Sequence, residues 1–104
     1  MVDVPRFVYR FAWDAVKAAG NARKHGVRFE LAATVFRDPL ALSRYDEGHS
    51  EQEERWVTLG QAESDVLLVV VHTFEQASAN EARVRIISVR LATAHERRHY
   101  ENAH

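Results

Sequence analysis

The sequence predicts one α+β domain over residues 1–104, in which an N-terminal strand and two helices precede four more strands and a closing helix. The chain opens with an alternating aromatic segment and continues with two segments whose apolar residues recur at helical spacing. Its second half places short β-branched runs between polar connections. A chain of 104 residues suffices for a single modest hydrophobic core. We expect the strands to form a mostly antiparallel meander.

The N-terminal half contains the first strand and both early helices. Residues 6–13 alternate aromatic with other side chains, which favours a strand. Asp14 suits the N-cap of a helix over residues 15–25, and Gly26 suits the left-handed residue that ends it. A second helix is predicted over residues 29–36, before an Asp-Pro pair that stops it. Two short helices in tandem should pack as a hairpin on one face of the sheet.

The C-terminal half contains the other strands and the closing helix. An almost wholly apolar run, residues 66–73, indicates a central strand buried on both faces. Residues 75–82 are polar and are expected to form a loose connection. Thr93 and Glu96 form a capping box that begins a helix over residues 94–104. The other strands are predicted over residues 40–45, 55–59 (ending at Gly60) and 83–90, with a polar loop at 46–54.

Composition excludes several kinds of functional site. The chain has no cysteine, so it has no disulfide, thiolate metal site or thiol nucleophile. Its four glycines are isolated, which excludes a phosphate-cradling glycine-rich loop, and no Gly-x-Ser-x-Gly motif is present. His95 and His99 are spaced for a shared ion, but the two arginines between them disfavour a cation. We therefore expect neither a metal nor a cofactor.

No apolar run approaches the length of a membrane span, and the first ten residues lack the features of an export signal. We expect no membrane association and a cytoplasmic location. Charge is uneven along the chain: residues 1–45 hold eight Lys/Arg against four Asp/Glu, whereas residues 46–65 hold one against seven. A solvated acidic loop accounts for this pattern, and so does a surface whose basic part faces a polyanion.

The last two strands and the closing helix gather residue types that suit RNA cleavage without a metal. That reaction needs the 2′-hydroxyl as nucleophile, a base, an acid for the leaving 5′-oxygen, and cations for the pentavalent phosphorane. Simple alternation would place Ser88 and Arg90 on the same side of their strand as Val84 and Ile86. The same arginines also suit cross-strand pairs and a helix C-terminus. The residues of suitable type are Arg85, Arg90, Arg97, Arg98, His72 and Tyr100.

Six segments, in order, resemble the BrnT family of toxins. The resemblance covers residues 10–101 and implies a RelE-like fold and an endoribonuclease activity that blocks translation. It also implies an antitoxin with a ribbon–helix–helix DNA-binding region, in a heterotetramer that binds operator DNA only through the antitoxin. The segments are FAWD (11–14), RKHGV (23–27), FELAATVFRDPLAL (29–42), DEGHSEQEERWVTLG (46–60), LLVVVHT (67–73) and RVRIISVRLATAHERRHYE (83–101).

The residue types and the resemblance together indicate a set of site residues. Arg90 is the expected phosphate or transition-state clamp, and His72 or His25 is the acid/base candidate. His25 has a structural alternative, which is to cap the C-terminus of the first helix. Tyr100 either stacks a base or packs the closing helix on the sheet. The expected RNA-phosphate contacts are Lys24, Arg55, Arg85, Arg97 and Arg98.

The chain departs from the family pattern at a few positions. Arg28 stands where a capping hydroxyl is usual, which costs the second helix about 1 kcal/mol. Leu91 replaces a usually basic residue, so RNA binding is weaker or His95 takes over part of the role. The alternative function is a non-catalytic binding module, whose basic residues recognise only the antitoxin and which acts through that DNA-binding partner.

Overall fold

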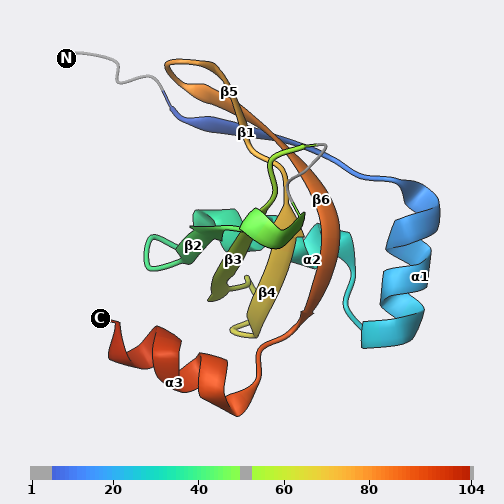
Figure 1. The fold of residues 1–104 in the computed structure, drawn as a ribbon, viewed down its shortest axis with the longest axis vertical. Helices are drawn as coiled ribbons and strands as arrows, with labels where there is room; N and C mark the ends of the chain where they lie inside the picture. The colour runs from blue at the N-terminus through green and yellow to red at the C-terminus, as the bar shows by residue number, and fades with distance from the viewer. Residues whose placement is uncertain (1–5, 50–52, 104) are drawn as a thin grey trace.

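The computed structural model describes residues 6–49 and 53–103, and within them a mixed sheet of six strands carries helices (Figure 1). The α+β class is confirmed. The strands are β1 (Val8–Ala12), β2 (Leu42–Tyr45), β3 (Trp56–Gln61), β4 (Leu67–His72), β5 (Glu75–Ser78) and β6 (Glu81–Leu91). The helices are α1 (Ala15–His25), α2 (Phe29–Ala33) and α3 (Ala94–Asn102), with 3-10 turns η1 (Thr34–Arg37) and η2 (Glu47–His49).

The long strand β6 organises the sheet. The strand order is β1-β6-β4-β3-β2, and β5 pairs with the first residues of β6. β1 runs parallel to β6, whereas the other pairs are antiparallel, as expected for most of the sheet. In Figure 1, β6 is a single curved strand that leads from the β1–β5 end of the molecule to α3.

The residues predicted to begin and end the first helix do so in the structure. The Asp14 carboxylate accepts hydrogen bonds from the backbone N–H groups of Val16 and Lys17 at 2.9 and 3.0 Å, and Gly26 ends α1 at φ +69°. The side chain of Arg28 makes no capping hydrogen bond to α2, as the missing hydroxyl predicted. α2 is shorter than expected, because its chain tightens into η1 after Ala33.

Each face of the sheet carries its own apolar cluster. On one face, α2 and η1 bury Phe29 and Val35 against β4 and β6. On the opposite face, a smaller cluster around Leu59 and Val69 lies under α3, with Tyr100 packed against it. All but one of the residues of β4 are buried, which confirms the prediction of a central strand covered on both sides. The two early helices each contact β6, rather than forming a hairpin that rests on the sheet as a unit.

Two expectations about the strands are wrong. Residues 75–82 are not a loose connection, because Glu75–Ser78 form β5 in a hairpin with β6. All four residues of β5 are exposed, so its sequence carries no alternation by which it could be recognised. Gly60 lies inside β3 rather than after it. A glycine is needed there because η1 packs so closely that a Cβ would stand 2.6 Å from a methyl of Val35. Residues 50–52 of the predicted polar loop, and His104 of the predicted last helix, lie outside the described residues.

The side chain of Asn21 replaces a neighbouring strand where β1 has ended. Asn21 is buried on α1, and its amide bonds both the N–H and the C=O of Val89 in β6, at 3.1 and 2.9 Å. It also donates to the carbonyl of Val27 at 3.1 Å. One amide therefore fixes α1, the chain before α2 and the free edge of β6.

We expect Asn21→Leu to lower the free energy of unfolding by about 2–3 kcal/mol, because a leucine of similar size leaves the buried polar groups of Val89 unpaired. Chemical denaturation measures the change. Lys17→Leu, on an exposed position of the same helix, is the matched control and should shift stability by less than about 0.5 kcal/mol. An Asn21→Leu protein as stable as the control would contradict this role.

Candidate functional site

A β-bulge in β6 decides which side chains share a face. Val71 of β4 pairs with Ser88, whereas the next residue, His72, pairs with Ile86, so Ile87 is an extra residue in β6. The alternation of the strand shifts there by one position. The expectation that Ser88 and Arg90 lie on the side of Ile86 is therefore wrong, and both point toward the face that carries α3.

The strands on this face align in two rows. Arg44 of β2 and Ser88 of β6 end one row, with Val57 and Val71 between them. In the next row, Arg90 stands beside Val69 of β4. Each row thus has an apolar middle and a polar or charged end on β6.

A hollow of about 220 Å³, which we call the His25 pocket, lies over these rows. His25, at the end of α1, and Arg90, near the end of β6, line it together, as do Arg44 and Ser88. A larger hollow of about 560 Å³, which we call the α3 groove, adjoins it and shares Arg44 and Arg90. The predicted clamp and one predicted acid/base candidate are thus brought together. The other residues that line the α3 groove are Leu42, Ser43, Val57, Leu59, Val69, His95, Glu96, His99 and Ala103.

The guanidinium of Arg90 is held by Glu96 of α3. Two parallel hydrogen bonds join the groups, at 2.8 Å from Nη1 and 2.9 Å from Nη2. Glu96 also accepts from the backbone N–H of Thr93, so the same carboxylate completes the predicted capping box. The hydrogen bonds from Arg90 lower the pKa of Glu96 to about 2, and those to Glu96 raise the pKa of Arg90. Both groups are charged at neutral pH, and a fork that fits a carboxylate also fits a phosphate.

His72 lies on the other face of the sheet and does not meet Arg90. It is 2% exposed, and its ring stands edge-on to Phe36 of η1 with centroids 4.8 Å apart. Its Nδ1 donates to the carbonyl of Thr73 at 2.9 Å, so Nε2 accepts from the hydroxyl of Thr58 at 2.6 Å. Burial lowers the pKa of His72. A neutral, fully bonded core histidine results, and the structure separates it from the His25 pocket.

The five residues predicted to contact RNA phosphates lie in different parts of the surface. Arg55 and Arg85 both contact the carboxylate of Glu53, beside the loop that precedes β3. Lys24 is exposed next to His25 at the end of α1, and α3 exposes both Arg97 and Arg98. None of these five cations lines the His25 pocket.

Tyr100 packs α3 onto the molecule. Its ring lies against the apolar cluster under α3, and its hydroxyl donates to Asp38 at 2.6 Å. Partial burial, together with this hydrogen bond, raises the pKa of Tyr100 to about 12. Of the two roles expected for Tyr100, this geometry supports packing of α3 on the sheet rather than stacking on an RNA base.

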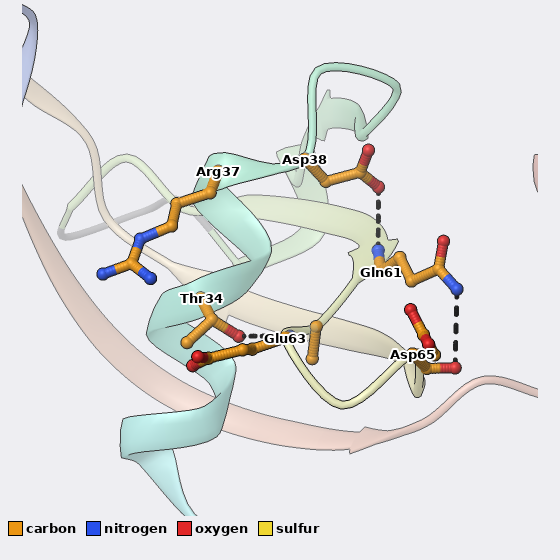
Figure 2. Close-up of a pocket in the computed structure, with 7 residues that line it drawn as sticks. Thr34, Arg37, Asp38, Gln61, Glu63 and Asp65 are labelled. Carbon is orange, nitrogen blue, oxygen red and sulfur yellow. Dashed lines mark hydrogen bonds between the residues drawn. The ribbon is translucent and has the colours of Figure 1, made fainter.

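Asp38 belongs to a third hollow, of about 240 Å³, on the side of η1 (Figure 2). Its carboxylate accepts from the backbone N–H of Gln61 at 2.8 Å, and the hydroxyl of Thr34 accepts from the N–H of Glu63 at 2.9 Å. Figure 2 shows these contacts joining η1 to the end of β3, with Arg37 beside them. The acidic groups here hold the fold together, and this hollow is separate from the His25 pocket.

Sequence reasoning missed Arg44 as a lining residue and Glu96 as the partner of Arg90. Arg44 was findable, because it follows the apolar Leu42 by two residues in a predicted strand and so shares its face. The pairing of Arg90 with Glu96 follows from the turn between β6 and α3 and has no signature in spacing. Among residues 6–49 and 53–103, no three metal-ligating side chains stand close enough to hold an ion, and no helix is long and apolar enough to cross a membrane.

Comparison with known proteins identifies the family. The family described as the ribonuclease toxin, BrnT, of type II toxin–antitoxin systems matches residues 13–96. A similar solved structure is the ribonuclease toxin BrnT of Brucella abortus, with a TM-score of 0.50 and 19% identity over 83% of this chain and 99% of that one. The comparison with curated proteins gave no match. Because the family match spans most of the chain, the protein belongs to the BrnT family of ribonuclease toxins of type II toxin–antitoxin systems.

Proposed function

We propose that this toxin cleaves RNA at the His25 pocket without a metal ion, and so inhibits translation. One observation carries the proposal: Arg90 and His25, from elements far apart in the sequence, line one pocket on the α3 face. Family membership supplies the reaction class, ribonuclease. The pocket supplies a guanidinium that can stabilise the phosphorane and an imidazole that can act as the base.

In the proposed reaction, Arg90 binds two non-bridging oxygens of the scissile phosphate. His25 accepts the proton of the 2′-hydroxyl, whose oxygen attacks phosphorus as the bond to the 5′-oxygen breaks. The leaving 5′-oxygen takes up a proton from water, and the other product carries a 2′,3′-cyclic phosphate. Arg44, across the pocket floor from Ser88, adds positive charge where the phosphorane develops. We leave His72 out of this site, because it is buried on the opposite face.

RNA must displace Glu96 from Arg90 in order to bind. Arg90 is half-buried and Glu96 also caps α3, so the exchange couples the pocket to the N-terminal turn of that helix. A phosphate presents its oxygens to the guanidinium in the same bidentate geometry as the carboxylate. The resting contact with Glu96 therefore keeps the fork formed and charged before the substrate arrives.

We further propose that the fold is RelE-like and that the toxin works in the cytoplasm. Its antitoxin carries a ribbon–helix–helix region, forms a heterotetramer with the toxin and alone contacts operator DNA. The apolar floor of the α3 groove supports docking of an antitoxin segment on the catalytic face, because it offers buried area next to Arg90. The family match names a ribonuclease and gives no support to a non-catalytic module.

We expect Arg90→Ala to abolish growth arrest in bacteria and to lower RNA cleavage by the purified chain about 100-fold or more. Arg90→Lys should recover only part of the loss, since an ammonium ion lacks the bidentate fork. Arg37→Ala, an exposed arginine on the other side of the sheet, is the matched control. Full cleavage by a folded Arg90→Ala protein would contradict the site, and loss of wild-type cleavage in EDTA would contradict the metal-independent mechanism.

We expect His25→Ala to lower the cleavage rate about 100-fold and to change the shape of the pH–rate profile, because the proposed base is lost. A pH–rate profile separates this role from helix capping. Loss of the cap alone would lower stability and leave the shape of the profile unchanged. His99→Ala, which changes a histidine of the adjoining groove, shows whether any nearby imidazole has the same effect.

The contact between Arg90 and Glu96 should give stability a specific pH dependence. Because folding lowers the pKa of Glu96 from 4.5 to about 2, the pair stabilises the fold above the ordinary value and loses that contribution as pH falls toward 2. Since the side chain of Arg90 is 42% exposed, solvent screening limits the effect to about 1 kcal/mol. We expect wild type to exceed Glu96→Gln in unfolding free energy at neutral pH, and the difference to vanish near pH 2. A difference independent of pH would contradict the charged pair.

A further inference from the structure

The face of the sheet that carries Arg90 carries further arginines along β6. Arg83 and Arg85 lie two residues apart on this strand, about 6.6 Å along its axis, and the bulge at Ile87 keeps both on the side of Arg90. Arg10 of β1 stands beside Arg83 in the parallel register. Arg83, Arg85 and Arg90 therefore follow β6, whose long curve is seen in Figure 1, and Arg10 lies beside Arg83 on the neighbouring strand.

The end of this line farthest from α3 is hollowed. A depression of about 370 Å³ is lined by Arg10, Arg83 and Arg85, together with Thr73 and Glu75. The His25 pocket lies over the other end of the same strand and includes Arg90. β6 thus joins two hollows, each with arginine at its wall, on one face of the molecule.

Each arginine of the line is paired with a glutamate from elsewhere in the chain. Arg83 contacts Glu75 of β5 at 2.9 Å, and Arg10 contacts Glu81 at the start of β6. The side chains of Arg10 and Arg83 are 67% and 64% exposed, so these pairs contribute little to stability. Phosphate oxygens can replace the carboxylates at small cost. The other two pairs are Arg85 with Glu53 and Arg90 with Glu96.

We propose that β6 is a track for one extended RNA strand, which runs from the scissile phosphate at Arg90 to Arg85, Arg83 and Arg10. The inference rests on the proposed function for its starting point and assigns binding residues beyond it. A single strand fits, because three of the four cations follow β6 and the fourth, Arg10, lies beside Arg83. The contacts are to phosphates, so the track adds affinity for RNA without recognising its sequence. The paired glutamates compete with the phosphates and so weaken RNA binding.

The test measures binding of 2′-O-methyl oligonucleotides, which lack the nucleophile and are not cleaved, by fluorescence anisotropy at several salt concentrations. A dinucleotide is compared with a strand of about eight nucleotides. Wild type should bind the longer strand more tightly. Arg83→Ala and Arg10→Ala should each lose several-fold of that gain and lower the salt slope by about 0.7. Arg37→Ala, on the opposite layer, should retain the full gain.

A variant of opposite sign separates RNA binding from a structural role. Glu75→Gln releases Arg83 and should tighten binding of the longer strand several-fold. Weaker RNA binding by Glu75→Gln, equal to that of Arg83→Ala, would show that the pair only maintains the fold and would overturn the track.

An antitoxin that loses affinity for these variants, while the longer RNA strand does not, would show a protein interface instead. If Arg90→Ala abolishes cleavage while Arg83→Ala and Arg10→Ala bind the longer strand normally, the track fails and the proposed function stands. If Arg90→Ala leaves cleavage intact, the proposed function fails on its own evidence.

Discussion

The extra residue in β6 is the constraint on which the functional face depends. Without Ile87 opposite the β4 ladder, Ser88 and Arg90 would point into the core beneath α2, where a charged guanidinium has no partner. With it, the first half of β6 supplies Val84 to the core, and the end of the strand turns its polar residues toward α3. One irregularity in pairing thus lets a single strand build both a hydrophobic core and a cationic surface.

The bulge acts together with two contacts that hold the neighbouring helices in place. The amide of Asn21 fixes α1 to the edge of β6, which brings His25 to the pocket. The carboxylate of Glu96 fixes the start of α3 to Arg90. Helices from the two halves of the chain are therefore each attached to the last residues of β6. The site combines strongly bonded positioning groups with exposed cationic groups, a combination that the proposed RNA-binding function requires.

Local chemistry predicted the features of this fold that depend on a few adjacent residues. Asp14 and Gly26 bound α1, and the capping box starts α3, because capping depends only on residues one to three positions away. Residue type and the resemblance to the BrnT family indicated Arg90 and His25 as site candidates, but they also indicated His72, which is a core residue. The bulge, the exposed strand β5 and the pairing of Arg90 with Glu96 escaped prediction, because each depends on which segments pair in space.

A crystal structure of this chain with a bound 2′-O-methyl oligonucleotide would show which groups hold the scissile phosphate. We expect a phosphate bound by the guanidinium of Arg90, with Glu96 displaced from it and the imidazole of His25 within hydrogen-bond distance of the modified 2′-oxygen. RNA bound on the α2 face, or bound on the α3 face with the contact between Arg90 and Glu96 intact, would contradict it.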